Sequence, residues 1–222
     1  MCKKVMRSSI CIVLCCIAMA VVDGILQPGY AVKSAVKILL FFALPAALLY
    51  PERKYAFSFT KPDKGSVIWG FGLGLLTLGV ILGGYHLLRH IIDLSSIPDA
   101  LSKDAGITAD NFLYVSLYIC LCNSFLEEFF FRGFAYLYLK KNGSEVFACI
   151  FSAAAFAVYH CAILDGWFSP VLYALILVAL FGCGLLFNLL DRRRERIWLS
   201  WLIHLFANLG INVIGMKLLG MF

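Results

Sequence analysis

Charged side chains are scarce in this sequence. Of its 222 residues, 14% are charged and 62% are hydrophobic, whereas soluble domains have about 25% charged and about 45–50% apolar residues. This scarcity excludes a soluble globular protein. Seven transmembrane helices of about 20 residues each would use roughly 140 residues, which leaves too little chain for a soluble domain of about 100 residues. The sequence therefore predicts one integral membrane domain, 1–222.

Several motifs are also missing. The nine cysteines form no CxxC pair and show no zinc-ligand spacing. His86 and His90 are four residues apart, but Leu87 stands where a zinc protease motif HExxH needs glutamate. The net charge of +6 comes from short basic clusters between apolar runs and not from a basic stripe. These absences predict a protein without a nucleic-acid partner and without a cysteine-based or HExxH zinc site.

The apolar residues divide into seven segments that predict an all-α, polytopic helix bundle. The first has a basic start and is too long for a cleaved signal peptide, so we interpret it as a retained helix. The second contains Pro45, and the third is rich in glycine, which is typical of helices whose backbones approach closely. The predicted spans are 8–26, 37–50, 67–88, 112–139, 146–164, 171–190 and 197–219.

The basic clusters predict the orientation of the bundle. With a cytoplasmic amino terminus, alternate loops receive 13 of the 19 basic residues, as the positive-inside rule requires. The carboxyl terminus is then outside. The long external loop 89–111 has a possible helix start at Ser96, followed by Pro98. The 13 residues are Lys3, Lys4, Arg7, Arg53, Lys54, Lys61, Lys64, Lys140, Lys141, Arg192, Arg193, Arg194 and Arg196.

The fourth segment carries three charges where lipid-facing residues are expected: Glu127, Glu128 and Arg132. Each costs about 2.5–3.5 kcal/mol at the centre of a membrane helix, so their presence indicates a function. Glu128 and Arg132 are four residues apart and can pair on one helical face. Glu127 is rotated by about 100° from Glu128 and stays unpaired within its helix.

Two further segments contain polar residues at helical spacing, with His160 four residues after Phe156 and Asn208 four after His204. Glu127 lies 13 residues before Lys140, His160 lies 15 after Glu145, and Asn208 lies 12 after Arg196. At 1.5 Å per residue, these three depths agree within one helical turn. The depths predict that the three helices bring these side chains together. Asn123 and Asn212, one turn from Glu127 and Asn208, are candidates for orienting them.

A carboxylate, two imidazoles and an amide can hydrolyse a bond with an activated water. Glutamate serves as a general base, and histidine holds the water and protonates the leaving amine. Cysteine catalysis is disfavoured, because Cys161 directly follows His160 and adjacent helix positions point about 100° apart.

At these residues the chain resembles the CAAX prenyl protease and bacteriocin-processing family of intramembrane proteases, called CPBP or Abi. Its motifs EExxxR, FxxxH and HxxxN occur here in order on successive helices, and together they are specific. The resemblance covers about residues 112–210. The three motifs read Glu127-Glu128-Phe-Phe-Phe-Arg132, Phe156-Ala-Val-Tyr-His160 and His204-Leu-Phe-Ala-Asn208.

The resemblance implies peptide-bond hydrolysis within the membrane. By this analogy, Glu127 and His160 activate water, while His204 and Asn208 form the oxyanion hole. Glu128 and Arg132 support the site, and no cofactor is implied. The partner is a membrane-associated peptide or protein substrate; eukaryotic members of the family remove the last three residues of prenylated CAAX proteins. This chain is compact like the bacterial members, which predicts a bacterial cytoplasmic membrane.

Other hypotheses fit the same residues. Two histidines and a glutamate form a known catalytic zinc set, so Glu127, His160 and His204 also suit a zinc metalloprotease. Intramembrane carboxylates serve as proton relays in transporters, and a membrane protein that confers bacteriocin immunity or binds a partner needs no catalysis. The sequence leaves these hypotheses open beside the protease.

Overall fold

The computed structural model describes residues 3–56 and 58–222, and within them every regular element is helical. Seven helical spans of this part are long and apolar enough to cross a membrane. The predicted all-α bundle of about seven transmembrane helices is thus confirmed. The spans are Lys3–Leu26, Tyr30–Tyr55, Lys64–Leu88, Ala109–Asn142, Glu145–Ile163, Pro170–Asp191 and Trp198–Leu218.

Several spans combine α-helical segments with tighter or wider turns. In the first two spans the elements are α1 (Lys3–Val21), the π-helical turn η1 (Val22–Leu26), α2 (Tyr30–Ile38), the π-helical turn η2 (Leu39–Ala43), α3 (Leu44–Leu49), the 3-10 turn η3 (Tyr50–Glu52) and α4 (Arg53–Ala56). The third span is α5 (Lys64–Leu88), and α6 (Ile97–Ala105) follows it. The remaining elements are α7 (Ala109–Tyr118), η4 (Ile119–Asn123), α8 (Ser124–Glu128), η5 (Phe129–Tyr138), α9 (Leu139–Asn142), α10 (Glu145–Ile163), α11 (Pro170–Asp191) and α12 (Trp198–Leu218).

The second span corrects the sequence analysis. We predicted it over 37–50, but the helix begins at Tyr30. The predicted span began at Lys37 and left Lys33 outside it. In the structure these lysines lie inside the span, because Lys33 pairs with Asp23 and Lys37 pairs with Glu127. A pairing charge on another helix offsets much of the cost of a lysine at that depth.

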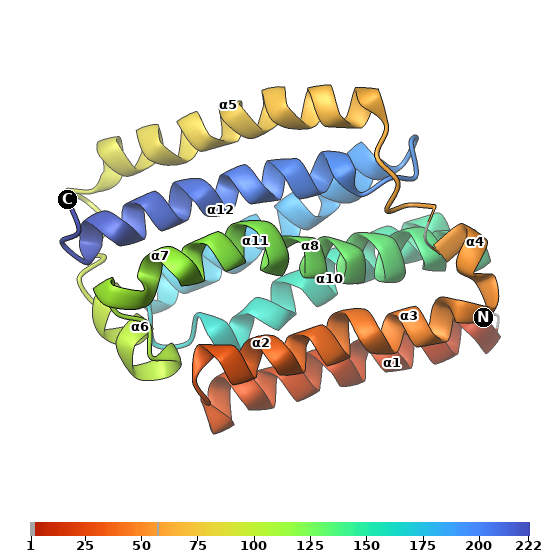
Figure 1. Cartoon of the computed structure of the whole chain (residues 1–222), viewed down its shortest axis with the longest axis horizontal. Helices are drawn as coiled ribbons and strands as arrows, with labels where there is room; N and C mark the ends of the chain where they lie inside the picture. The colour runs from red at the N-terminus through yellow and green to blue at the C-terminus, as the bar shows by residue number, and fades with distance from the viewer. Residues whose placement is uncertain (1–2, 57) are drawn as a thin grey trace.

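The fourth span runs through the middle of the bundle, between the α5–α12 pair and the hairpin of the first two spans (Figure 1). Every residue of η5 is buried. Its phenylalanines pack against the second and fifth spans, and Phe130 stacks on Phe41 with ring centroids 4.1 Å apart. A helix whose whole circumference is buried can carry charged groups away from lipid.

The π-helical turn η4 precedes the two glutamates, and its backbone carbonyl groups accept hydrogen bonds from side chains. The Ile119 carbonyl accepts from the Ser124 N–H and from the Asn208 amide. The Ser124 hydroxyl donates to the Cys120 carbonyl and accepts from the Trp201 indole, 3.1 Å away. Such turns occur frequently at functional sites. Here the turn is tied to α12, which fixes α8 relative to the helix that carries His204.

Close helix contacts occur at particular glycines. Gly70 of α5 lies so near α12 that a methyl group there would meet the Leu202 side chain at 2.7 Å. Gly184 of α11 similarly faces the Ala153 backbone of α10 at 2.9 Å. The glycine-rich α5 therefore packs as predicted at Gly70, whereas a methyl group at Gly72 would meet nothing within 4 Å.

The loop after α5 contains the predicted helix. Helix α6 begins directly after Ser96, with Pro98 in its first turn. His86 in the last turn of α5 and His90 just after this helix are exposed. The eight cysteines of the described part are free thiols, while Cys2 lies outside the described residues.

The predicted cytoplasmic loops gather at one end of the bundle through ion pairs. Arg194 pairs with Asp63 at 2.7 Å, and Lys140 pairs with Glu195 at 3.3 Å. Lys4 near the amino terminus pairs with Glu52 at 2.5 Å. The basic clusters therefore lie at one end of the molecule, as their occurrence in alternate loops of the sequence predicted. That this end faces the cytoplasm stays a prediction.

Candidate active site

Three helices bring Glu127, His160 and His204 together. Glu127 is on α8 and is 2% exposed. Its Oε2 lies 3.9 Å from Nε2 of His160 on α10 and 3.8 Å from Nε2 of His204 on α12. Both distances exceed the usual 2.7–3.2 Å of a hydrogen bond, and Oε2 has no hydrogen-bond partner among the described residues. One free carboxylate oxygen thus faces two imidazole nitrogens.

Each imidazole is oriented through its other nitrogen. Nδ1 of His160 is 2.8 Å from the Phe156 carbonyl, one turn earlier on α10. A carbonyl only accepts, so Nδ1 carries the proton, and Nε2 of the neutral ring keeps its lone pair. Nδ1 of His204 is 2.8 Å from Oε1 of Glu128. Partners of this kind fix both the tautomer and the direction of a histidine ring.

Glu128 connects His204 and Arg132 and is fully buried. Besides holding His204, its Oε2 lies 3.2 Å from Nε of Arg132, which confirms the pair predicted from their spacing. The guanidinium is also fully buried and lies against the rings of Phe156 and Phe187, at 4.3 and 5.0 Å from their centroids. The bond from Glu128 to His204 links the EExxxR and HxxxN motifs, and the sequence analysis did not predict it.

Asn208 is on the same face of α12 as His204 but is not bonded to the other site residues. Its amide donates to the Ile119 carbonyl over 3.3 Å. An amide nitrogen has two hydrogens, so one N–H is left for another acceptor. Of the two asparagines considered as orienting groups, Asn123 does contact Glu127, donating to Oε1 over 3.0 Å. Asn212 instead joins α12 to α7 by donating to the Ser116 carbonyl.

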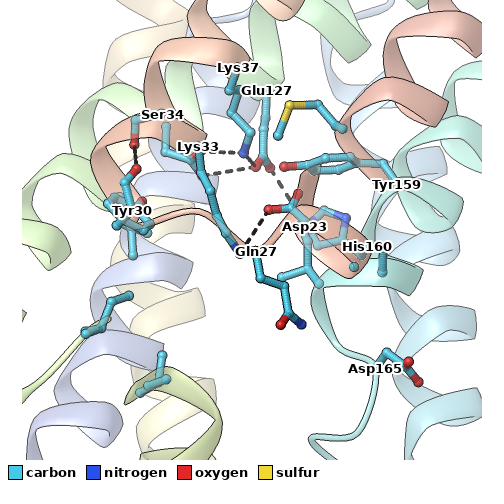
Figure 2. Close-up of a pocket in the computed structure, with 18 of the residues that line it drawn as sticks. Asp23, Gln27, Tyr30, Lys33, Ser34, Lys37, Glu127, Tyr159, His160 and Asp165 are labelled. Atoms are coloured by element: carbon cyan, nitrogen blue, oxygen red, sulfur yellow. Dashed lines mark hydrogen bonds and ion pairs between the residues drawn. The ribbon is translucent and has the colours of Figure 1, made fainter. Parts of the chain in front are cut away.

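A cavity of about 280 Å³ leads to Glu127 and His160 from the end of the bundle near α6. Figure 2 shows polar side chains from the first two spans along it, with Lys37 directed at Glu127 and Lys33 directed at Asp23. We did not predict any of these residues. The signal was available, because a second span of only 14 residues is short of the roughly 20 needed to cross a bilayer, and extending it backwards from Tyr50 makes Lys37 intramembrane.

The three residues considered for zinc lie close to one another. In the part of the chain that the structure describes, however, no group of three His, Cys, Asp or Glu side chains is arranged to hold a metal ion. The nearest approach of Glu127 to both imidazoles is through the single oxygen Oε2.

Comparison with known families identifies the central region. Residues 109–210 match the family described as type II CAAX prenyl endopeptidase, Rce1-like. This part of the chain is similar to the Rce1-like family. The match confirms the resemblance predicted over about 112–210 and supports a CAAX-type intramembrane protease at the level of the family. No curated protein and no solved structure matches the chain significantly.

The Rce1-like region contains all the site residues predicted from the motifs. It begins at α7 and ends within α12. Lys37, Lys33 and Asp23 lie outside it, on the first two spans. The candidate site is therefore completed by residues that precede the Rce1-like region in the sequence. With seven apolar spans and this family, the chain is an integral membrane protein.

Proposed function

We propose that the protein is an intramembrane endopeptidase that hydrolyses peptide bonds with a water activated by Glu127 and His160. The observation that carries this proposal is the free Oε2 of Glu127, which faces Nε2 of both histidines at 3.9 and 3.8 Å. If a water lies about 2.8 Å from the carboxylate oxygen and about 2.8 Å from either nitrogen, the angle at the water between these two atoms is roughly 90°. That position suits a nucleophile held by a base.

In this mechanism the water oxygen attacks the carbonyl carbon of the scissile peptide bond. Its proton passes to Oε2 of Glu127, while the lone pair on Nε2 of His160 accepts a hydrogen bond from the second hydrogen. Glu127 then donates the proton that it accepted to the leaving nitrogen as the C–N bond breaks. The products are an amine and a carboxylic acid, which loses its remaining proton to solvent to become a carboxylate, and the site needs no covalent intermediate.

The developing negative charge on the carbonyl oxygen requires donors. We assign this role to His204 and Asn208, one turn apart on α12. His204 donates from Nε2 when both ring nitrogens carry protons, and the Glu128 carboxylate accepts the proton on Nδ1 in that state. Asn208 contributes the N–H that is not used by Ile119.

The substrate class follows from the location of the site. A base buried within apolar spans acts on a chain that enters the membrane, so the substrate is a membrane-associated peptide or protein. The family name does not require that it be prenylated. The location that we propose is the bacterial cytoplasmic membrane, and the basic clusters favour an amino terminus in the cytoplasm.

The test compares the protein termini in membranes from cells that express the wild type, Glu127→Ala or Glu195→Ala. Glu195 is an exposed glutamate paired with Lys140 and serves as the matched control. We expect new termini with the wild type and the control, and their loss with Glu127→Ala. If the wild type and Glu127→Ala give the same termini, the protease proposal is wrong.

The same cells separate the alternatives. Loss of cleavage after chelation, with recovery on adding zinc, would establish the zinc metalloprotease in place of the metal-free mechanism. A protective phenotype against a bacteriocin that survives Glu127→Ala would favour a binding or immunity role over proteolysis. Proton-coupled transport would show as a pH-dependent flux without new termini.

A further inference from the structure

Lys37 is a buried cation next to the candidate base. It is on α2, lies outside the Rce1-like region and is 7% exposed. Its Nζ lies 2.9 Å from Oε1 of Glu127 and 2.5 Å from Oδ1 of Asn123. Figure 2 shows its side chain ending at the Glu127 carboxylate on the wall of the cavity. A lysine at such depth is costly and indicates a function.

The contacts of Lys37 make the two oxygens of Glu127 unequal. Oε1 accepts from Nζ of Lys37 and from Nδ2 of Asn123, at 2.9 and 3.0 Å. Oε2 has no hydrogen-bond partner among the described residues and faces the two histidines. Two donors on one oxygen fix the plane of the carboxylate. The other oxygen is consequently held toward the place where the proposed water would lie.

The surroundings of Lys37 keep its ammonium at this place. The ring centroid of Tyr159 is 4.9 Å from Nζ, and that of Phe41 is 5.8 Å away. Aromatic faces at these distances attract a cation without competing for its hydrogen bonds. Asn123 receives a bond from Lys37 and returns one to Glu127, so the three residues form a closed triangle. The ammonium therefore has little freedom to leave Oε1.

We infer that Lys37 is the positioning residue of the base: it anchors Oε1 of Glu127 from α2, so that Oε2 alone acts on the water. The inference rests on the proposed protease function. It extends the catalytic apparatus beyond the Rce1-like motifs to the second span. Lys37 acts through Glu127 and does not itself touch the reacting atoms.

The catalytic test measures the new termini of the preceding experiment, normalised to the amount of folded protein. Lys37→Met keeps the length of the side chain and removes its charge. We expect it to lower the yield of termini roughly 10–100-fold, as loss of a group that orients a catalytic residue does elsewhere. Lys37→Arg keeps a charged donor, and the cavity beside it has room for the larger group, so it should recover part of the yield.

The matched control is Lys140→Met. Lys140 also pairs with a glutamate, Glu195 at 3.3 Å, but at the end of the bundle that holds the basic clusters. This variant should give wild-type yield. If Lys37→Met also gives wild-type yield, or if Lys37→Arg falls as far as Lys37→Met, the positioning role is overturned.

A second measurement tests the ion pair without relying on activity. Thermal unfolding in detergent is compared for Lys37→Met, Glu127→Gln and the double variant. Each single change leaves a buried charge without its partner, so each should lower Tm, and the double variant should regain most of the loss. Additive losses would overturn the inference.

The outcomes also separate this inference from the proposed function. If Glu127→Ala and the wild type give the same termini, the protease proposal fails, and the catalytic role of Lys37 fails with it. If Glu127→Ala abolishes the termini but Lys37→Met does not lower their yield, the inference on Lys37 alone is wrong.

Discussion

At the scale of single residues, the site depends on which partner each charged side chain has. Glu127 and Glu128 are adjacent in the sequence, yet each is held by a different cation, Lys37 for the first and Arg132 for the second. The free oxygen of Glu127 faces Nε2 of both histidines, whereas Oε1 of Glu128 lies next to Nδ1 of His204. Two neighbouring carboxylates thus have distinct tasks, because α8 directs them to different helices.

Glu128→Gln tests the link between the ion pair and His204. It leaves Arg132 charged and buried without its partner, and we expect a loss of stability on the order of 3–5 kcal/mol. It also removes the acceptor for Nδ1 of His204, so cleavage should fall. Unfolding in detergent and the yield of termini measure the two effects.

The double variant Glu128→Gln with Arg132→Met distinguishes these effects. Removing both charges should restore much of the stability and none of the activity. Wild-type cleavage by the double variant would show that Glu128 does not act through His204.

Asn208→Ala tests the oxyanion assignment. Because a donor preorganised toward developing charge stabilises mainly the transition state, kcat should fall by roughly 10²–10³ with little change in KM. Asn212→Ala is the control on the next turn of α12, where the amide bonds to the Ser116 carbonyl. It should lower Tm and leave kcat unchanged. A raised KM at constant kcat in Asn208→Ala would make this residue a substrate-binding group instead.

At the scale of elements, the sequence predicted the helices that are uniformly apolar and missed the start of one that is not. The span 170–191 begins and ends within one residue of its predicted bounds. The second span begins seven residues earlier than predicted. Its first two turns contain Lys33 and Lys37, and their partners are on other helices. Local hydropathy does not include such a partner, so the predicted helix began too late in the sequence.

Gly184→Leu should separate α11 from α10. A side chain at this position meets the Ala153 backbone, which has no flexible end that could move aside. We expect a loss of about 1–3 kcal/mol in unfolding free energy, as in other overpacked helix contacts. Gly182→Leu introduces the same side chain two residues earlier, where a Cβ meets nothing within 4 Å. If both variants unfold like the wild type, the result contradicts the close approach of α10 and α11 at Gly184.

At the scale of the whole molecule, the basic residues gather at one end and the cavity opens toward the other, near α6. The positive-inside rule assigns the basic end to the cytoplasm. The cavity would then receive its substrate from the outer half of the membrane.

Reporter fusions test this orientation. Alkaline phosphatase, which is active only outside the cytoplasm, should be active when fused after Phe222 and inactive when it is fused in the loop after Asn142. Fluorescence of a green fluorescent protein at the same two points should show the opposite pattern. The reverse result at both points would invert the topology.

The sequence by itself determined the class of the fold, the motifs and the Glu128–Arg132 pair, because each depends on composition or on spacing within one helix. It also indicated that Glu127, His160 and Asn208 share a depth, because rise per residue is nearly constant. Only the tertiary structure decided that Glu128 holds His204, that Asn208 bonds to Ile119 and that Lys37 anchors Glu127. These contacts join different helices, and their geometry depends on how the helices are rotated and on the π-helical turn before α8, which spacing along the chain does not specify.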